Sequence, residues 1–204
     1  MNKLYKILIC VLKPLIKIVY RLKITGMENI PKSGRAILCP NHTSNADPVI
    51  LAISCPRQVF FMAKKELFSN KFLRKILLYL GAFPVDRGNR DKGAINIAEE
   101  VLQKGNILGL FIEGTRSKTG EFLKPKNGAA LLACNTHTPV VPICISGGNQ
   151  KRVRAFRKNV INIGSPIYYG EKNNAEMDGK EIRNFSRQIM DAIMGLSGTI
   201  KKQS

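Results

Sequence analysis

The chain has 204 residues, of which 44% are hydrophobic, and this suffices for one domain with a sizeable core. Lysine and arginine total 33 against 14 acidic residues, a net charge of +19, which indicates a negatively charged partner: nucleic acid, an anionic membrane or a phosphorylated substrate. Nucleic acid is the least favoured of these, because tryptophan is absent, aromatic residues are few, and no helix-turn-helix or zinc-finger spacing occurs.

The first 22 residues form a basic amphipathic segment. Residues 4–20 are mostly apolar, yet they contain three lysines and Pro14, which a spanning helix or a signal peptide would lack. At about 100° per residue, the cations fall on one narrow stripe of a helix: Lys3, Lys6, Lys13, Lys17 and Arg21. This pattern is typical of a helix that lies in the headgroup layer of a membrane, or of one packed on the protein's own core. We predict a membrane-anchoring helix, or a pair of helices separated at Pro14.

The remaining residues, 23–204, alternate short apolar runs with amphipathic segments. Strands are predicted at residues 36–39, 59–62, 107–112, 140–145 and 160–163, and helices from residue 47 and over residues 65–80, 94–103, 128–134 and 175–194. Asp47 followed by Pro48 is a helix-start signal with Asp47 as the N-cap. The alternation predicts an α/β domain with a mixed, mostly parallel central sheet flanked by helices. Ligands bind beyond the strand ends of such sheets.

His42 is the better candidate for a catalytic base among the two histidines. His137 lies in a polar connection without an acidic neighbour, whereas His42 follows a predicted strand and precedes Asp47 by five residues. A turn between them can bring the carboxylate to one imidazole nitrogen, which fixes the tautomer and leaves the other nitrogen to accept a proton. The spacing alone is common, and a loop histidine beside a helix-capping aspartate would have the same sequence.

The segment that contains this pair is the first of four segments, each of which lies at the end of a predicted element. They are Asn41-His42-Thr43-Ser44-Asn45-Ala46-Asp47, residues 83–87, Glu113-Gly114-Thr115-Arg116 and Val141-Pro142-Ile143. In this order they resemble the four motifs of the glycerolipid acyltransferases, and residues 24–167 are most similar to the bacterial 1-acyl-sn-glycerol-3-phosphate acyltransferase family. The resemblance makes residues 23–204 an acyltransferase domain and residues 1–22 its membrane-anchoring segment.

The resemblance implies transfer of a fatty acyl group from a thioester to the sn-2 hydroxyl of 1-acylglycerol 3-phosphate, which gives phosphatidic acid. His42 would be the general base and Asp47 would orient it. Arg87, Arg116 and a lysine, Lys64 in preference to its neighbour, would bind the substrate phosphate, since a guanidinium binds phosphate through two donors. The remaining motif positions would organise the site loop or line the acyl site: Glu113, Gly114 and Thr115 for the loop, and Val141, Pro142 and Ile143 for the acyl chain.

No metal or prosthetic group is implied. The expected partners are an anionic membrane surface, lysophosphatidic acid and a donor thioester of acyl carrier protein or coenzyme A, at the cytoplasmic face of a bacterial cell membrane. Two alternatives stay open: an acyltransferase of the same fold for another lyso-lipid or glycerol 3-phosphate, and a non-enzymatic basic protein that binds anionic membrane or nucleic acid. The basic cluster at residues 151–158 has no motif role, and is either solvated loop charge or a second contact with anionic headgroups.

Overall fold

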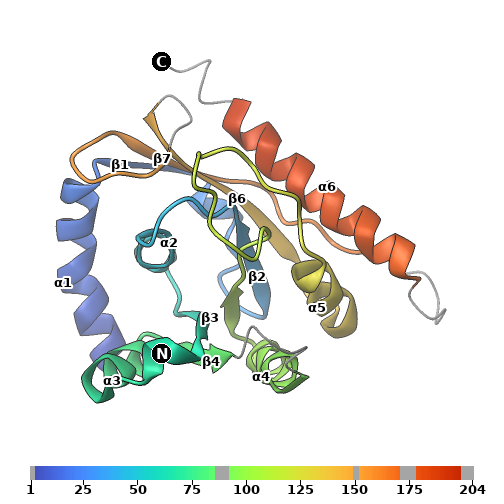
Figure 1. Ribbon diagram of the computed structural model, residues 1–204, viewed down its shortest axis with the longest axis horizontal. Helices are drawn as coiled ribbons and strands as arrows, with labels where there is room; N and C mark the ends of the chain where they lie inside the picture. Colours follow the sequence, from blue (N-terminus) through green and yellow to red (C-terminus); the bar gives the residue numbers. More distant parts are fainter. Residues whose placement is uncertain (1–2, 86–91, 149–151, 171–177, 199–204) are drawn as a thin grey trace.

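A seven-stranded sheet separates two layers of helices (Figure 1). The computed structural model describes residues 3–85, 92–148, 152–170 and 178–198. The strands are β1 (Leu22–Thr25), β2 (Ala36–Pro40), β3 (Val59–Lys64), β4 (Ala82–Val85), β5 (Ile107–Gly109), β6 (Val140–Gly147) and β7 (Asn159–Ile163). They lie in the order β1-β7-β6-β2-β5-β3-β4, and of these neighbouring pairs only β6 and β7 run antiparallel. The predicted mixed, mostly parallel sheet is confirmed.

The helices cover both faces of this sheet (Figure 1). They are α1 (Lys3–Val19), α2 (Asp47–Ser54), α3 (Lys71–Tyr79), α4 (Lys92–Gln103), α5 (Gly128–Thr136) and α6 (Gly179–Gly198), with 3₁₀ turns η1 (Met27–Asn29) and η2 (Lys65–Phe68). Alternate residues of β2 enter opposite cores, as a strand requires. Ile37 and Cys39 pack in the core under α4, α5 and α6, whereas Ala36 and Leu38 pack in the core under α2.

The structure differs from the sequence-based expectations in two additional strands and in one predicted helix that is interrupted. β1 and β4 were not predicted, because four residues are too few for a pattern and Pro84 is unusual in a strand. Pro84 is tolerated because β4 lies at the sheet edge, where a missing N–H breaks no ladder. The helix predicted over residues 65–80 is instead η2 followed by α3, with a break at residues 69–70.

The strand directions bring several loops to one edge of the sheet. β2 to β6 run parallel, so their carboxyl ends lie together, and we call this the carboxyl edge. β7 runs opposite to β6, and β1 is parallel to β7, so both of these strands begin at the carboxyl edge. The C-terminal end of α1, which leads into β1, therefore lies at the edge from which the predicted site loops emerge.

Helix α1 is a single helix despite Pro14, so the helix-pair alternative is wrong. One side packs on the protein, with Tyr5 buried and Ile9 and Ile16 against the core near α2. The opposite side exposes an apolar stripe, each member of which has 55–74% of its surface accessible: Ile7, Val11, Leu15 and Ile18. Within the described ranges, no helix combines the length and apolar character that crossing a bilayer requires.

Candidate active site

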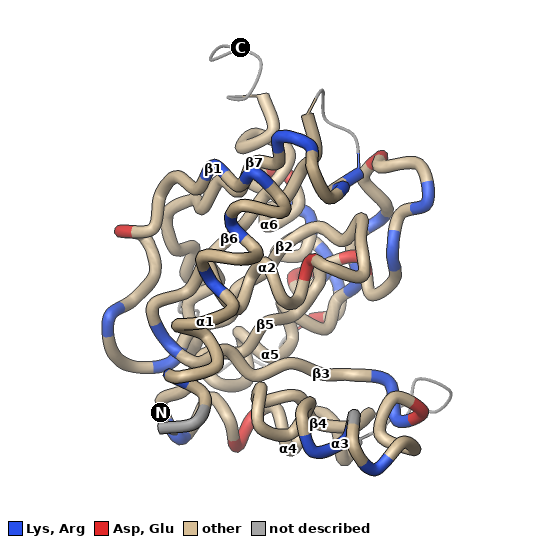
Figure 2. Tube along the Cα trace, turned by 90° about the vertical axis from the view of Figure 1, so that its left-hand side faces the viewer, with Lys and Arg blue, Asp and Glu red and all other residues tan. Residues whose placement is uncertain are grey.

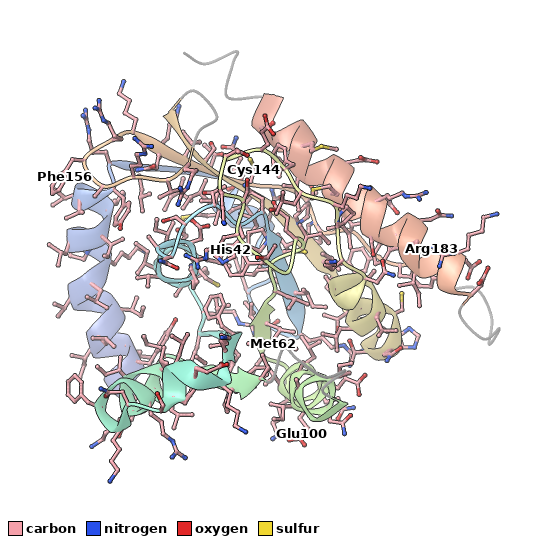
Figure 3. The ribbon with its side chains drawn as sticks, viewed as in Figure 1. His42, Met62, Glu100, Cys144, Phe156 and Arg183 are labelled. Atoms are coloured by element: carbon pink, nitrogen blue, oxygen red, sulfur yellow. The ribbon has the colours of Figure 1, made fainter. Side chains whose placement is uncertain are left out.

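His42 and Asp47 form a hydrogen-bonded pair just beyond the carboxyl end of β2, near the centre of Figure 3. The distance from Nδ1 of His42 to Oδ2 of Asp47 is 2.9 Å. The same oxygen accepts the backbone N–H groups of Thr43 at 2.6 Å and Ser44 at 2.7 Å. Asp47 is fully buried, whereas the His42 side chain retains 14% of its exposure. The predicted contact is confirmed, and the buried carboxylate fixes the orientation of the imidazole through its Nδ1 atom.

The predicted capping role of Asp47 is wrong. Ala46 occupies the N-cap position of α2, and no side chain there bonds to the first helical amides. The Asp47 carboxylate instead faces back toward the loop that precedes the helix, because its three hydrogen bonds go to residues 42–44. The helix start fixes the backbone of Asp47, and its side chain fixes the loop that carries His42.

Asn41 attaches the beginning of this loop to the neighbouring strand β6. Its side-chain Nδ2 donates to the carbonyl of Ile145 at 3.0 Å, and its Oδ1 accepts the N–H of Ile145 at 2.7 Å. Asn41 is buried, so the pair of bonds is shielded from water. His42 thus follows a residue whose position is fixed by the sheet.

The loop after β5 surrounds His42 on its remaining sides. The Phe111 ring stacks on the imidazole with a centroid distance of 4.0 Å and an angle of 25° between the rings. Oε1 of Glu113 accepts the backbone N–H of His42 at 3.4 Å, and the Ser117 N–H donates to the His42 carbonyl at 2.8 Å. Three contacts from residues about 70 positions away therefore set the position and plane of the imidazole.

Glu113 is a buried carboxyl group beside the His42–Asp47 pair. Burial is the main cause that raises the pKa of Glu113 to about 7; the nearby Asp47 carboxylate adds a smaller increase, and backbone hydrogen bonds with His42 and Leu123 partly offset the two. Its Oε2 and Oδ1 of Asp47 are buried and have no hydrogen-bond partner among the described residues. The sequence predicted that Glu113 organises the site loop, and the hydrogen bonds found join its carboxyl group to backbone amides of His42 and Leu123.

Two of the three cations predicted to bind phosphate, Arg116 and Lys64, lie within the described residues, and both are at the carboxyl edge. Arg116 is exposed, and its Nη1 donates to Oδ1 of Asn45 in the His42 loop. Lys64, the last residue of β3, is exposed and forms an ion pair with Glu66, with 3.0 Å between Nζ and Oε1. Arg87 lies outside the described residues. Both described cations are open to solvent.

The other motif positions have distinct surroundings. Gly114 has a φ of +66°, a conformation that favours glycine, and Thr115 beside it is exposed. Val141, Pro142 and Ile143 are buried in β6, two of them within the core that also contains Leu38. None of these three lines the cavity of about 650 Å³ between η2, α3 and β4, so their acyl-lining role remains a prediction.

Arg152 is a site residue that sequence reasoning did not identify. Its Nε donates to the Thr43 carbonyl at 3.0 Å, and its Nη1 donates to the Lys118 carbonyl at 3.4 Å. It therefore joins the His42 loop to the loop after β5. The basic run 151–158 drew attention to this segment, but its local sequence does not distinguish Arg152 from the other cations. The described residues contain no cluster of three or more His, Cys, Asp or Glu side chains that could hold a metal ion.

A buried aspartate that orients a partly exposed histidine at the carboxyl edge of an α/β sheet is an arrangement for general-base chemistry. Residues 21–146, more than half of the chain, match the Acyltransferase family, and the chain belongs to this family of enzymes. The motif resemblance in the sequence is thereby confirmed, and the protein is an acyltransferase.

Two relatives of this chain have the same name. The 1-acyl-sn-glycerol-3-phosphate acyltransferase of Bacillus subtilis is 32% identical over 171 residues, which cover 82% of this chain and 84% of that protein. The enzyme of the same name from Borreliella burgdorferi is 32% identical over 184 residues, 87% of this chain and 72% of its own. The crystal structure of the 1-acyl-sn-glycerophosphate (LPA) acyltransferase PlsC from Thermotoga maritima matches 96% of this chain and 80% of its own, with a TM-score of 0.72 and 25% identity.

Proposed function

We propose that the protein transfers a fatty acyl group from an acyl thioester to the free sn-2 hydroxyl of 1-acylglycerol 3-phosphate, giving phosphatidic acid for phospholipid synthesis. The observation that carries the proposal is the 2.9 Å contact between Nδ1 of His42 and the buried Asp47 carboxylate. The names of the relatives support the choice of this acceptor. An exposed Arg116 beside the pair suits a substrate that bears a phosphate.

His42 acts as the general base in this mechanism. When neutral, its Nδ1–H donates to Asp47, which leaves the lone pair of Nε2 free to accept the proton of the substrate hydroxyl. The hydroxyl oxygen attacks the thioester carbonyl as the proton moves to Nε2. Asp47 then stabilises the imidazolium, and Phe111 keeps the ring in its plane.

The leaving group departs with the same proton. The tetrahedral intermediate collapses by breaking the carbon–sulfur bond, and the thiolate takes the proton from Nε2 of His42. The products are the new ester and the free thiol, and the neutral histidine is regenerated. This sequence needs no acyl-enzyme, and no G-x-S-x-G nucleophile elbow occurs in the chain.

Arg87, Arg116 and Lys64 bind the phosphate of the acceptor in this proposal. Arg116 follows β5, which lies next to β2 in the sheet, and Lys64 is the last residue of β3, which lies next to β5. Their exposed head groups offer charged donors within reach of the same edge as His42. Binding the phosphate there would place the glycerol hydroxyls toward the imidazole, so the three cations act as positioning groups for the acceptor.

The donor and the membrane complete the proposal. The acyl group arrives as a thioester of acyl carrier protein or coenzyme A, and no metal or prosthetic group takes part. The exposed apolar stripe of α1, flanked by lysines, supports binding in the headgroup layer at the cytoplasmic face of the membrane. Such binding brings the enzyme to a water-insoluble acceptor.

The test compares two histidine variants. Purified protein is incubated with acyl thioester and a panel of lyso-acceptors, and the product is identified by mass. His42→Asn should lower turnover by about 10²–10⁴-fold, the usual contribution of a general base. His137→Asn is the matched control, because His137 is exposed and its φ of +47° is one that asparagine adopts readily. Turnover by His42→Asn within a few-fold of His137→Asn would show that the mechanism is wrong.

A further inference from the structure

The connection from β6 to β7 carries an exposed aromatic residue that no site motif explains. Phe156 has 74% of its surface exposed and a φ of +59°. A bulky residue rarely adopts this left-handed conformation, and an apolar ring that stays exposed to water does not contribute burial energy to the fold. Because β6 ends and β7 begins at the carboxyl edge, Phe156 lies at the same edge as His42.

Hydrogen bonds fix this turn to the C-terminal end of α1. The Phe156 N–H donates to the Val19 carbonyl at 2.6 Å. The buried Asn159 side chain donates through Nδ2 to the carbonyls of Tyr20 at 2.5 Å, Arg154 at 2.9 Å and Arg157 at 2.8 Å. Ile18, the last member of the exposed stripe of α1, is also 74% exposed. The turn therefore extends the apolar surface of α1 with a ring held in a defined place.

Cations flank the exposed ring on both sides. Arg154, Arg157 and Lys158 are exposed, and residues 152–158 contain no acidic residue. Figure 2 looks at the molecule from the side of α1 and shows further lysines and arginines along this helix. An aromatic ring among cations, next to an apolar helical stripe, is complementary to an anionic lipid surface and its acyl chains.

We propose that residues 154–158 form a second membrane contact, in which the Phe156 ring enters the lipid interface while the three cations bind anionic headgroups. The proposal rests on the membrane binding by α1 suggested above. A single helix lying in the interface leaves the protein free to turn about the helix axis. A second contact at the carboxyl edge removes this freedom and holds the edge that contains His42 toward the lipid.

The same connection is attached to the catalytic loop. Arg152 donates to the Thr43 carbonyl at 3.0 Å, and the Val153 N–H donates to Oγ1 of Thr43 at 3.5 Å. Val153 is itself buried in the core with Ile145 and Ile161. The contact with lipid and the loop that carries His42 are thus separated by two residues of a fixed segment. This proximity shortens the path of a lipid acceptor from the bilayer to the base.

The experiment measures sedimentation of the whole protein with phosphatidylcholine vesicles that contain or lack phosphatidylglycerol. Phe156→Asn removes the ring and tolerates the positive φ, and should weaken binding by about tenfold or more, as expected for loss of a buried phenylalanine. The matched control is Tyr168→Asn, an equally exposed aromatic residue that follows the opposite end of β7. Equal binding by the two variants would overturn the proposal.

A charge variant tests the cations separately. Arg154, Arg157 and Lys158 are together replaced by glutamine, and binding to vesicles with phosphatidylglycerol should fall by about 100-fold, with little change on neutral vesicles. The control replaces Lys180, Arg183 and Arg187, three exposed cations of α6, and Figure 3 shows Arg183 on the opposite side of the molecule from Phe156. Equal losses in the two triple variants would also overturn the proposal, since net charge alone would then explain the binding.

Two further measurements separate this proposal from the proposed function. Turnover of a short-chain, water-soluble lysophosphatidic acid without vesicles should be the same for Phe156→Asn and the unaltered protein, and loss of that turnover would mean that the turn supports the fold instead. Serine replacement of the α1 stripe, Ile7, Val11, Leu15 and Ile18, tests the helix alone. If those serine variants bind fully while Phe156→Asn does not, membrane binding by the helix is refuted, and with it the part of this proposal that makes the turn a second contact beside the helix.

Discussion

Replacement of Glu113 by glutamine should remove a pH dependence of stability that the buried carboxyl group creates. Glu113 has 1% of its surface exposed, and burial raises its pKa from an ordinary 4.5 to about 7. Between these two values the folded protein binds more protons than the unfolded chain. The free energy of unfolding therefore falls as the pH rises through this range, and the loss is complete above pH 7.

The size of the effect follows from the pKa. One pKa unit corresponds to about 1.4 kcal/mol, so the rise in the pKa of Glu113 corresponds to about 3 kcal/mol of lost stability at high pH. Glutamine has nearly the shape of the neutral acid, keeps an oxygen for the His42 N–H and carries no charge. Glu113→Gln should thus be similar to the unaltered protein near pH 5 and more stable by up to about 3 kcal/mol near pH 8.

Urea denaturation followed by circular dichroism, repeated from pH 5 to pH 8, measures this difference directly. Glu121→Gln is the control, because Glu121 is exposed on the same loop. Its stability should follow that of the unaltered protein at each pH. Curves for Glu113→Gln and the unaltered protein that stay parallel across the range would refute the reasoning, since the carboxyl group would then titrate alike in the folded and unfolded states.

Three other residues give separate predictions. Asn41→Ala should lower the free energy of unfolding by about 2–3 kcal/mol in urea, because two buried groups of Ile145 lose their partner; a loss below 0.5 kcal/mol would contradict this. Phe111→Ala should lower kcat at least tenfold with little change in KM for the thioester, and an unchanged kcat would count against ring positioning. Arg152→Ala should lower kcat similarly on a soluble acceptor, whereas Arg187→Ala should not; equal rates would remove Arg152 from the site.

The His42–Asp47 contact could be predicted because it is local. Only four residues lie between His42 and Asp47, so one turn of the loop can bring the two side chains together. The direction of the carboxylate was not predictable in the same way. The Asp47 carboxylate could reach either the first amides of α2 or the amides of Thr43 and Ser44. Only the folded loop brings the amides of Thr43 and Ser44 to its Oδ2.

The contacts that the sequence did not reveal join residues that are far apart in the chain. Phe111 and Glu113 reach His42 from about 70 positions away, and Arg152 reaches Thr43 from 109 positions away. The local sequence around these residues does not indicate which residue they contact, because the strand order in the sheet brings the loops together. The same limit applies to β1 and β4, which are recognisable only through the strands they pair with.

The pairing of β1 with β7 has a consequence for the order in which the protein forms. Thr25 in β1 contacts Asn162 in β7 across a separation of 137 residues. During synthesis α1 and β1 leave the ribosome long before β7 exists, at rates of about 5–20 residues per second. For that interval the apolar side of α1 has no sheet edge to hold its C-terminal end. If the proposed membrane binding by α1 holds, the nascent helix can meet a lipid surface before β7 is made and closes the sheet.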